Sequence, residues 1–253
     1  MAVQIEHRRG VMLVRIDRPE RRNALDGPTM AQLGRAFTEA EAADAIHVVL
    51  LTGTGDHAFC SGMDLKAFAS DPQAFKVDGP GLEVFTTRCF PKPVVAAVNG
   101  SAVGGGFELA LACDLVVAAD HATFGLPEVK RGLVSAGGGT RLAARLPPAL
   151  AYEIGLTGDP IDASTAQRLG LVNQVVPHDQ LVSTALALAE RIAANAPLAV
   201  RAMKTLIYDE LPTHDEAEWA SIRAKASPVF SSEDAKEGAR AFAERRAPRW
   251  RGR

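Results

Sequence analysis

A glycine-rich turn that leads to a carboxylate is the strongest chemical signal in the sequence. The run Asn99–Glu108 follows the apolar stretch 94–98 and enters an apolar helical pattern at about Phe107. Glycines allow close backbone approach, and the N–H groups of a helix's first turn have no intrahelical acceptor. Because the positive end of the helix dipole lies behind them, these groups favour an anion or a developing oxyanion. Taken alone, the run fits a tight turn with close helix–sheet packing equally well.

Several familiar catalytic motifs are absent. Gly100 and Gly105 have the separation of a Walker A loop, but Gly106 and Phe107 stand where Lys and Ser or Thr are required, and Gly-x-Gly-x-x-Gly does not occur. The six histidines include no His-x-x-x-His pair, so no zinc or other metal site is predicted. Ser135 lacks the preceding glycine of a nucleophile elbow.

Two other segments have small residues or a carboxylate at turns. Residues 59–66, Phe-Cys-Ser-Gly-Met-Asp-Leu-Lys, follow an apolar strand pattern, and Glu128 follows Pro127, shortly before the glycines at 137–139. Separately, these segments fit an ordinary loop and a solvated or capping acid. If they face one pocket together with Glu108, they supply two N–H platforms and two carboxylates, which can divide acid and base roles.

The first 150 residues or so alternate between strand and helix patterns. Apolar, β-branched stretches at 11–17, 48–52, 94–98 and 115–118 predict strands, the first in a hairpin with residues 3–6. A helix is expected to begin near Pro28. Because uninterrupted apolar strands are typical of sheets covered on both faces, an α/β class is predicted. Residues 70–81 are expected to form a mobile surface excursion.

The C-terminal third is predicted to be mainly helical and to serve in oligomerisation or as a lid. One strand is expected at 172–176. The predicted helices span 149–156, 163–169, 181–194, 199–208, 215–226 and 233–246.

Composition narrows the classes of protein. The chain has 253 residues, 47% of them hydrophobic, with 28 Lys and Arg against 30 Asp and Glu. These values exclude a disordered chain and disfavour a globally basic nucleic-acid binder. The apolar run 109–119 is interrupted by Asp114 and is shorter than the roughly 18–20 residues of a membrane span. Three scattered cysteines and the absence of an N-terminal apolar region favour a reducing, cytoplasmic location.

Taken together, these segments resemble the enoyl-CoA hydratase/isomerase (crotonase) superfamily over essentially the whole chain. The resemblance implies ββα units wound into a spiral over residues 1–190 and a helical region, 191–253, for trimerisation and active-site cover. Homotrimers, or hexamers formed from two trimers, are expected. The matching stretches are Arg18-Pro19, Asn23–Leu25, Phe59–Lys66, Ala97–Glu108, Phe124–Glu128, Gly137–Leu142, Gly170–Val176 and Phe242–Arg246.

The resemblance also implies roles for individual residues. Glu108 is expected to activate water and Glu128 to deliver the α-proton, while backbone N–H groups of Met63 and Gly105 form an oxyanion hole. Many relatives have Ala in place of Met63, so its side chain is expected to reshape the acyl pocket. The acyl-CoA substrate itself supplies coenzyme A, and no further cofactor is expected. By the same resemblance, the residues expected to bind the acyl-CoA substrate are Arg22, Ala24, Ser61, Gly62, Met63, Asp64, Leu65, Lys66, Gly104, Gly105, Phe242 and Arg245.

The presence of both glutamates favours reversible hydration of a 2-trans-enoyl-CoA to a 3-hydroxyacyl-CoA, a reaction of fatty acid β-oxidation. One departure is Ser135-Ala136, where many hydratases have Pro-Gly. The tail 232–246 also resembles carnitinyl-CoA dehydratases, so that activity stays open, as do Δ3–Δ2 enoyl-CoA isomerisation and a non-enzymatic acyl-CoA-binding or RNA-binding role. Five arginines in the last nine residues are candidates for pairing with CoA phosphates, with a solvated tail favoured for Arg251 and Arg253.

Overall fold

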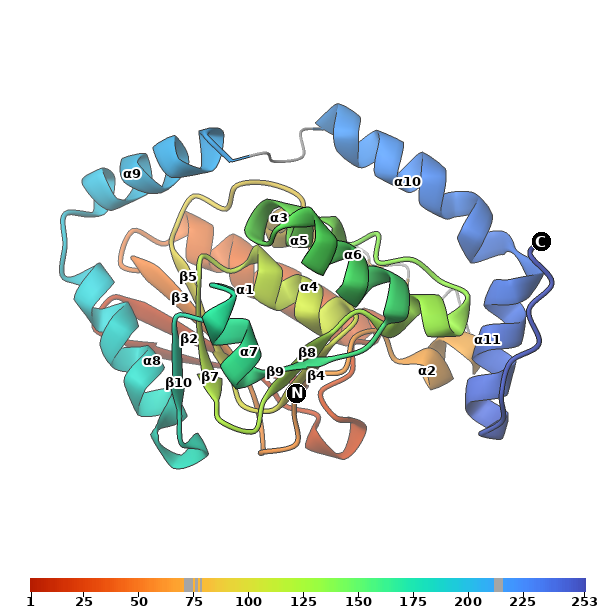
Figure 1. Cartoon of the computed structure of the whole chain (residues 1–253). Coiled ribbons are helices and arrows are strands. Elements are labelled where there is room, and N and C mark those ends of the chain that lie inside the picture. The colour runs from red at the N-terminus through yellow and green to blue at the C-terminus, as the bar shows by residue number, and fades with distance from the viewer. Residues whose placement is uncertain (71–74, 76, 78, 212–215) are drawn as a thin grey trace.

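Two sheets form the centre of the computed structural model, which describes residues 1–70, 75, 77, 79–211 and 216–253 (Figure 1). In the larger sheet, all neighbouring strands are parallel except the β1–β2 hairpin. Its strands, in sheet order, are β1 (Val3–Arg8), β2 (Val11–Ile16), β3 (Val48–Gly53), β5 (Val94–Val98), β7 (Leu115–Ala119) and β10 (Gln174–Val176). The smaller sheet contains β4 (Ala58–Cys60), β6 (Ser101–Val103), β8 (Thr123–Gly125) and β9 (Ile161–Asp162).

The chain visits the two sheets in turn, which gives the predicted spiral of ββα units. β3 is followed by β4, β5 by β6, and β7 by β8, so that each turn adds one strand to each sheet. The middle turn continues directly into helix α4 (Gly105–Ala112). Parallel strands end at the same edge of a sheet, so this topology brings together the turns that follow β4, β6 and β8, which are far apart in sequence.

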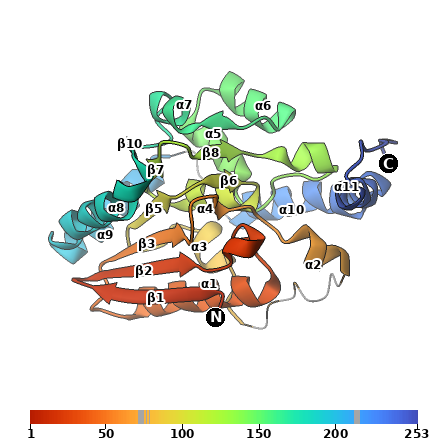
Figure 2. The same cartoon turned by 90° about the horizontal axis from the view of Figure 1, so that it is seen from below.

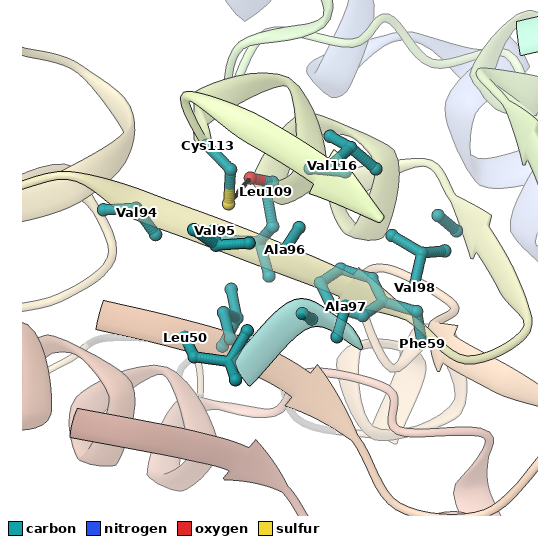
Figure 3. Close-up of a cluster of buried hydrophobic side chains, with 14 of the residues drawn as sticks. Leu50, Phe59, Val94, Val95, Ala96, Ala97, Val98, Leu109, Cys113 and Val116 are labelled. Atoms are coloured by element: carbon teal, nitrogen blue, oxygen red, sulfur yellow. Dashed lines mark hydrogen bonds between the residues drawn. The ribbon is translucent and has the colours of Figure 1, made fainter. Parts of the chain in front are cut away.

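The centre of the larger sheet is buried on both faces. Successive residues of a strand point to opposite faces, and every residue of β3 and β5 is buried. Figure 3 shows the β5 side chains surrounded by apolar groups that include Leu50, Phe59, Leu109 and Val116. Helices α1 (Gly27–Ala42) and α8 (His178–Ala193) both pack against this sheet.

Helix α1 begins where the sequence predicts. The Asp26 carboxylate accepts the backbone N–H of Thr29 at 2.9 Å, which caps the helix, and Pro28 lies in its first turn. The other helical segments are η1 (Pro19–Arg21), α2 (Leu65–Ser70), α3 (Glu83–Thr86), η3 (Pro127–Arg131), η4 (Gly139–Arg141), α5 (Leu142–Arg145), α6 (Pro148–Thr157), α7 (Ala163–Arg168), α9 (Pro197–Asp209), α10 (Glu216–Ser231) and α11 (Glu233–Glu244).

The C-terminal helices lie at the periphery of the spiral. In both views α8 and α9 lie at one end of the molecule and α11 at the other (Figure 1, Figure 2). Helix α11 contacts α2 and η3. None of the helices in the described part of the chain is long and apolar enough to cross a membrane. Cys60, Cys89 and Cys113 are free thiols.

Three sequence predictions are corrected here. Helix α10 continues past Pro228 to Ser231 rather than ending at 226, while its predicted first residue lies outside the described residues. Helix α8 begins three residues earlier than predicted. Half of the excursion expected at 70–81 lies outside the described residues, and its end packs tightly, because a Cβ on Gly34 would lie 2.2 Å from the Pro80 carbonyl oxygen.

Candidate active site

Two backbone N–H groups converge where the loop before α2 meets the start of α4. Met63 forms a single parallel bridge with Leu25, in which Leu25 N–H donates to the Gly62 oxygen and Asp64 N–H donates to the Leu25 oxygen. In such a bridge the central residue directs its own N–H to the opposite side. Gly105 begins α4 on that side, and a Cβ on Gly62 would lie only 2.9 Å from its nitrogen.

Glycine is required at this junction for steric reasons. Gly104 has φ +56° and ψ −127°, a conformation that side chains disfavour, and a Cβ there would lie 3.2 Å from Glu128 Oε1. A Cβ on Gly106 would lie 1.9 Å from the Cys60 carbonyl oxygen, so its absence lets α4 pack directly on β4. The glycine run therefore positions both an N–H donor and a carboxylate.

Glu108 lies in the first turn of α4 and is 9% exposed. Its Oε1 accepts the backbone N–H groups of Gly137 and Gly139, both at 2.9 Å, which leaves Oε2 available. Burial, and then the charge of Glu128, raise the pKa of Glu108 to about 7, although the two N–H donors oppose the shift. A carboxyl with this pKa exchanges protons readily at neutral pH.

Glu128 lies on η3, on the other side of the same junction. Its Oε2 is buried and has no hydrogen-bond partner within the described part of the chain. Burial raises the pKa of Glu128, and the Ser135 hydroxyl opposes that rise. Because each negative carboxylate disfavours the other, the two glutamates titrate as a pair and favour a state that shares one proton.

These groups face one cavity of about 480 Å³. Its interior is mainly apolar, with side chains from α1, α3, α4, α10 and the segment 133–136. Ten of the residues singled out from the sequence line it, namely Arg22, Ser61, Gly62, Met63, Leu65, Gly104, Gly105, Glu108, Glu128 and Phe242.

Other predicted binding residues lie outside this lining. Ala24 is buried, and its carbonyl oxygen accepts a hydrogen bond from the Arg18 side chain. The Asp64 carboxylate is also turned inward, because one oxygen pairs with Arg18 at 3.3 Å and the other accepts the Ala67 N–H at 3.2 Å. Arg245 is exposed at the left-handed C-cap of α11. The side chain of Lys66 is outside the described structure.

The tail arginines pair with carboxylates of the chain itself. Arg246 bonds to both Glu237 oxygens at 2.6 and 2.9 Å and also pairs with Glu244. Arg251 and Arg253 lie 3.4 Å from Glu233 and are largely exposed. The phosphate-binding hypothesis for these arginines therefore competes with ion pairs on α11.

Sequence reasoning missed several cavity residues. Leu82 and Thr86 lie on or beside α3, a single turn without a clear sequence pattern. Phe230 follows Pro228, where a helix end was expected. Arg131, three residues after Glu128, could have been noticed as a charged neighbour of a catalytic candidate. No group of three or more potential metal ligands occurs among the residues that the structure describes.

The ββα spiral is of the crotonase class, and its cavity is lined by Met63, Gly105 and the two glutamates. The chain belongs to the enoyl-CoA hydratase/isomerase family, whose model matches residues 6–253. It is an enzyme of the hydratase type, a lyase.

The similar proteins are hydratases and dehydratases of acyl-CoA esters. Mevalonyl-coenzyme A hydratase of Aspergillus fumigatus is 42% identical over 248 residues, covering 95% of this chain and 91% of that protein. Carnitinyl-CoA dehydratase of Proteus mirabilis is 41% identical and covers 100% of this chain and 99% of its own length. The crystal structure of carnitinyl-CoA hydratase from Mycobacterium avium matches with a TM-score of 0.93 and 45% identity, covering 100% and 99% of the two chains.

Proposed function

We propose that the enzyme adds water reversibly to a 2-trans-enoyl-CoA whose acyl group is uncharged. The observation that carries the proposal is the pair of carboxyls with raised pKa values, Glu108 and Glu128, beside the N–H groups of Met63 and Gly105. One carboxyl can accept a proton while the other donates one, and the N–H pair can hold the charge that develops between these two steps.

In the proposed hydration, Glu108 takes a proton from a water molecule while the water oxygen bonds to the β-carbon. The electron pair of the double bond moves toward the thioester oxygen, where the N–H groups of Met63 and Gly105 stabilise the negative charge. The enolate then takes a proton at the α-carbon from Glu128. The pair returns to its starting state when the proton gained by Glu108 is passed to Glu128, and dehydration follows the reverse path.

The cavity lining supports an uncharged acyl group. The lining includes the apolar side chains of Leu25, Leu82 and Leu109. Among the described lining residues, Glu108 and Glu128 are the acidic ones, whereas Arg22 and Arg131 are basic. A trimethylammonium group would therefore find no counter-charge beyond the reacting carboxyls. A carnitinyl-CoA dehydratase is the second candidate, favoured by 41% identity over the whole chain to the Proteus mirabilis enzyme.

A substrate panel tests these proposals. Crotonyl-CoA, longer enoyl-CoAs and crotonobetainyl-CoA are compared by the loss of conjugated thioester absorbance. Faster turnover of the uncharged esters supports the proposal, whereas preference for crotonobetainyl-CoA supports the second candidate. No turnover of any ester, or full activity of Glu128→Gln, contradicts hydration.

The matched variant Glu108→Ala separates hydration from isomerisation. It should abolish hydration, because it removes the base that activates water. A Δ3–Δ2 isomerase that uses Glu128 for proton transfer would retain activity with a 3-enoyl-CoA. Tight binding of CoA esters without either reaction would indicate a non-enzymatic role.

We also propose that the chain forms a homotrimer or a hexamer through its C-terminal region, residues 191–253, which packs on a spiral core formed by residues 1–190. Helix α9 supports this, because it has no buried residue and exposes Leu198, Met203, Leu206 and Ile207. Light scattering coupled to size-exclusion chromatography measures the assembly, and a monomer at micromolar concentration contradicts it.

The proposed setting is cytoplasmic lipid metabolism, with β-oxidation as the pathway. Similarity to bacterial acyl-CoA dehydratases supports it. Fractionation of the source cells measures the location. In this proposal coenzyme A enters only as part of the substrate, so activity should survive dialysis against EDTA, and loss of activity that added metal restores would contradict it.

A further inference from the structure

Arg131 is a cavity residue for which neither the sequence nor the proposed reaction supplies a role. It is the last residue of η3, three positions after Glu128. Its guanidinium carbon lies 4.6 Å from the centre of the Phe242 ring. Within the described chain it forms no ion pair, and its side-chain hydrogen bond is a long contact of 3.3 Å from Nη1 to the Lys130 oxygen.

The backbone of Arg131 is held in place by α11. A Cβ on Gly238 would lie 1.9 Å from the Arg131 carbonyl oxygen, so the helix and η3 are in direct contact. Gly132 has φ +66°, and a Cβ on it would lie 2.5 Å from the Asp234 oxygen. These two close contacts hold the backbone at Arg131 against α11 and so fix the point from which the Arg131 side chain extends. A fixed backbone is a condition for a defined binding site.

Burial indicates that Arg131 lies toward the mouth of the cavity. Leu109 is 1% exposed and Thr86 is 7% exposed, whereas Met63 is 39% and Phe242 is 42% exposed. Arg131 contacts Phe242, one of the two exposed lining residues. When a thioester carbonyl lies at the N–H pair, the acyl chain can extend toward the buried wall, while the nucleotide must extend out through the mouth.

We propose that Arg131 binds a phosphate group of the CoA moiety, with Phe242 orienting its guanidinium; this rests on the proposed acyl-CoA substrate. Stacking on an aromatic ring uses the face of the guanidinium and leaves its edge N–H groups free for two parallel hydrogen bonds to phosphate oxygens. Such charge-assisted pairs are stronger than neutral hydrogen bonds.

Two features argue against other roles for this side chain. It does not satisfy Glu128, whose Oε2 has no hydrogen-bond partner among the described residues. The basic tail, the other candidate for phosphate, has Arg246 engaged by Glu237 and Glu244. Arg131 is thus a cation at the cavity that no carboxylate of the described structure neutralises.

The test compares a CoA thioester with a thioester that lacks phosphates. Arg131→Gln should lower kcat/KM for crotonyl-CoA by about 10-fold to 100-fold, the range for hydrogen bonds to charged groups. It should leave kcat/KM for crotonyl-pantetheine unchanged. Lys130→Gln is the matched control, because Lys130 pairs with Asp159 on the surface of the same η3 segment and should leave both substrates unaffected.

Further substrates and a second variant sharpen the assignment. Dephospho-CoA esters, which lack the 3′-phosphate, tell which group Arg131 contacts: if the Arg131→Gln effect disappears with them, the contact is the 3′-phosphate, and if it persists, the diphosphate. Phe242→Leu should weaken use of crotonyl-CoA by about 2-fold to 5-fold, as expected for loss of an exposed cation–π contact. It should add little to Arg131→Gln.

Equal losses with crotonyl-CoA and crotonyl-pantetheine would overturn the proposal, because Arg131 would then act on the reacting groups. No loss with either substrate would overturn it as well. Calorimetric binding of acetyl-CoA supplies a readout without turnover. An enzyme that binds acetyl-CoA through Arg131 but does not hydrate enoyl-CoAs would contradict the proposed function and leave this inference standing.

Discussion

Replacing Glu108 by Gln is expected to abolish hydration and, at the same time, to stabilise the fold at neutral and alkaline pH. The side chain is 9% exposed, and as a carboxylate it lies near a second acid, Glu128. A Gln oxygen can still accept the N–H groups of Gly137 and Gly139, so the substitution removes the charge and keeps both hydrogen bonds. The proposed catalytic role and the stability of the fold therefore make opposite demands on this residue.

The magnitude follows from the pKa. Glu108 has a pKa of about 7 in the folded chain against an ordinary value of 4.5, so between these values the folded state binds more protons than the unfolded state. Stability consequently falls as the pH rises through that window, and the full penalty is present above about pH 7. At about 1.36 kcal/mol for each pKa unit, the penalty is about 3 kcal/mol, an order-of-magnitude value.

Thermal unfolding from pH 5 to pH 8 measures this effect. The Glu108→Gln variant should gain stability relative to the native chain as the pH rises, reaching about 6–12 °C at pH 8 for a domain of this size. Glu153→Gln is a suitable control, because Glu153 is exposed on α6. If Glu108→Gln is less stable than the native chain at pH 8, or follows the same pH dependence, the account of Glu108 is wrong.

Three further outcomes are expected. Gly62→Ala should lower kcat by about 100-fold to 1,000-fold, because its Cβ would lie 2.9 Å from the Gly105 nitrogen and displace a proposed oxyanion donor. Steady-state kinetics measure the effect, and a folded variant that retains its kcat would contradict this expectation. Asp64→Asn should lower the free energy of unfolding, measured by urea denaturation, by about 1–3 kcal/mol, because it weakens the contact with Arg18. It should leave the KM for crotonyl-CoA unchanged. A raised KM with unaltered stability would instead indicate that Asp64 binds the substrate directly. The kcat/KM for hydration should fall as the pH increases through about 7, because the pair then loses the one proton that it shares and Glu128 has none to deliver to the α-carbon; a flat profile across that range would exclude the pair from this role.

The strands that form the larger sheet were predictable because their signal is local. Residues 94–98 are an uninterrupted apolar run, and the structure buries all five of them in β5. The start of α1 was equally clear, since Pro28 is a local signal and lies in its first turn. Local patterns did not locate the strands of the smaller sheet, which only the family resemblance implied, because β4, β6 and β8 have three residues each, too few to show a period, and form only by pairing with one another.

The end of α10 was mispredicted for a related reason. Pro228 lacks a backbone N–H and usually marks a helix boundary, yet the helix continues to Ser231. Phe230, in that last turn, lines the cavity. The residues after Pro228 therefore line a cavity together with distant parts of the fold, and a local stretch of sequence does not show such contacts.

By itself, the sequence determined the α/β class, the glycine turns and the two glutamates, because residue type and spacing along the chain express them. Only the tertiary structure decided how they meet. The spiral brings Gly62 against Gly105 and places Glu128 beside Gly104, while Asp64 turns inward to Arg18 and Arg131 stacks on Phe242. Burial and proximity of this kind set the pKa of Glu108, since both depend on segments that fold together from distant positions in the chain.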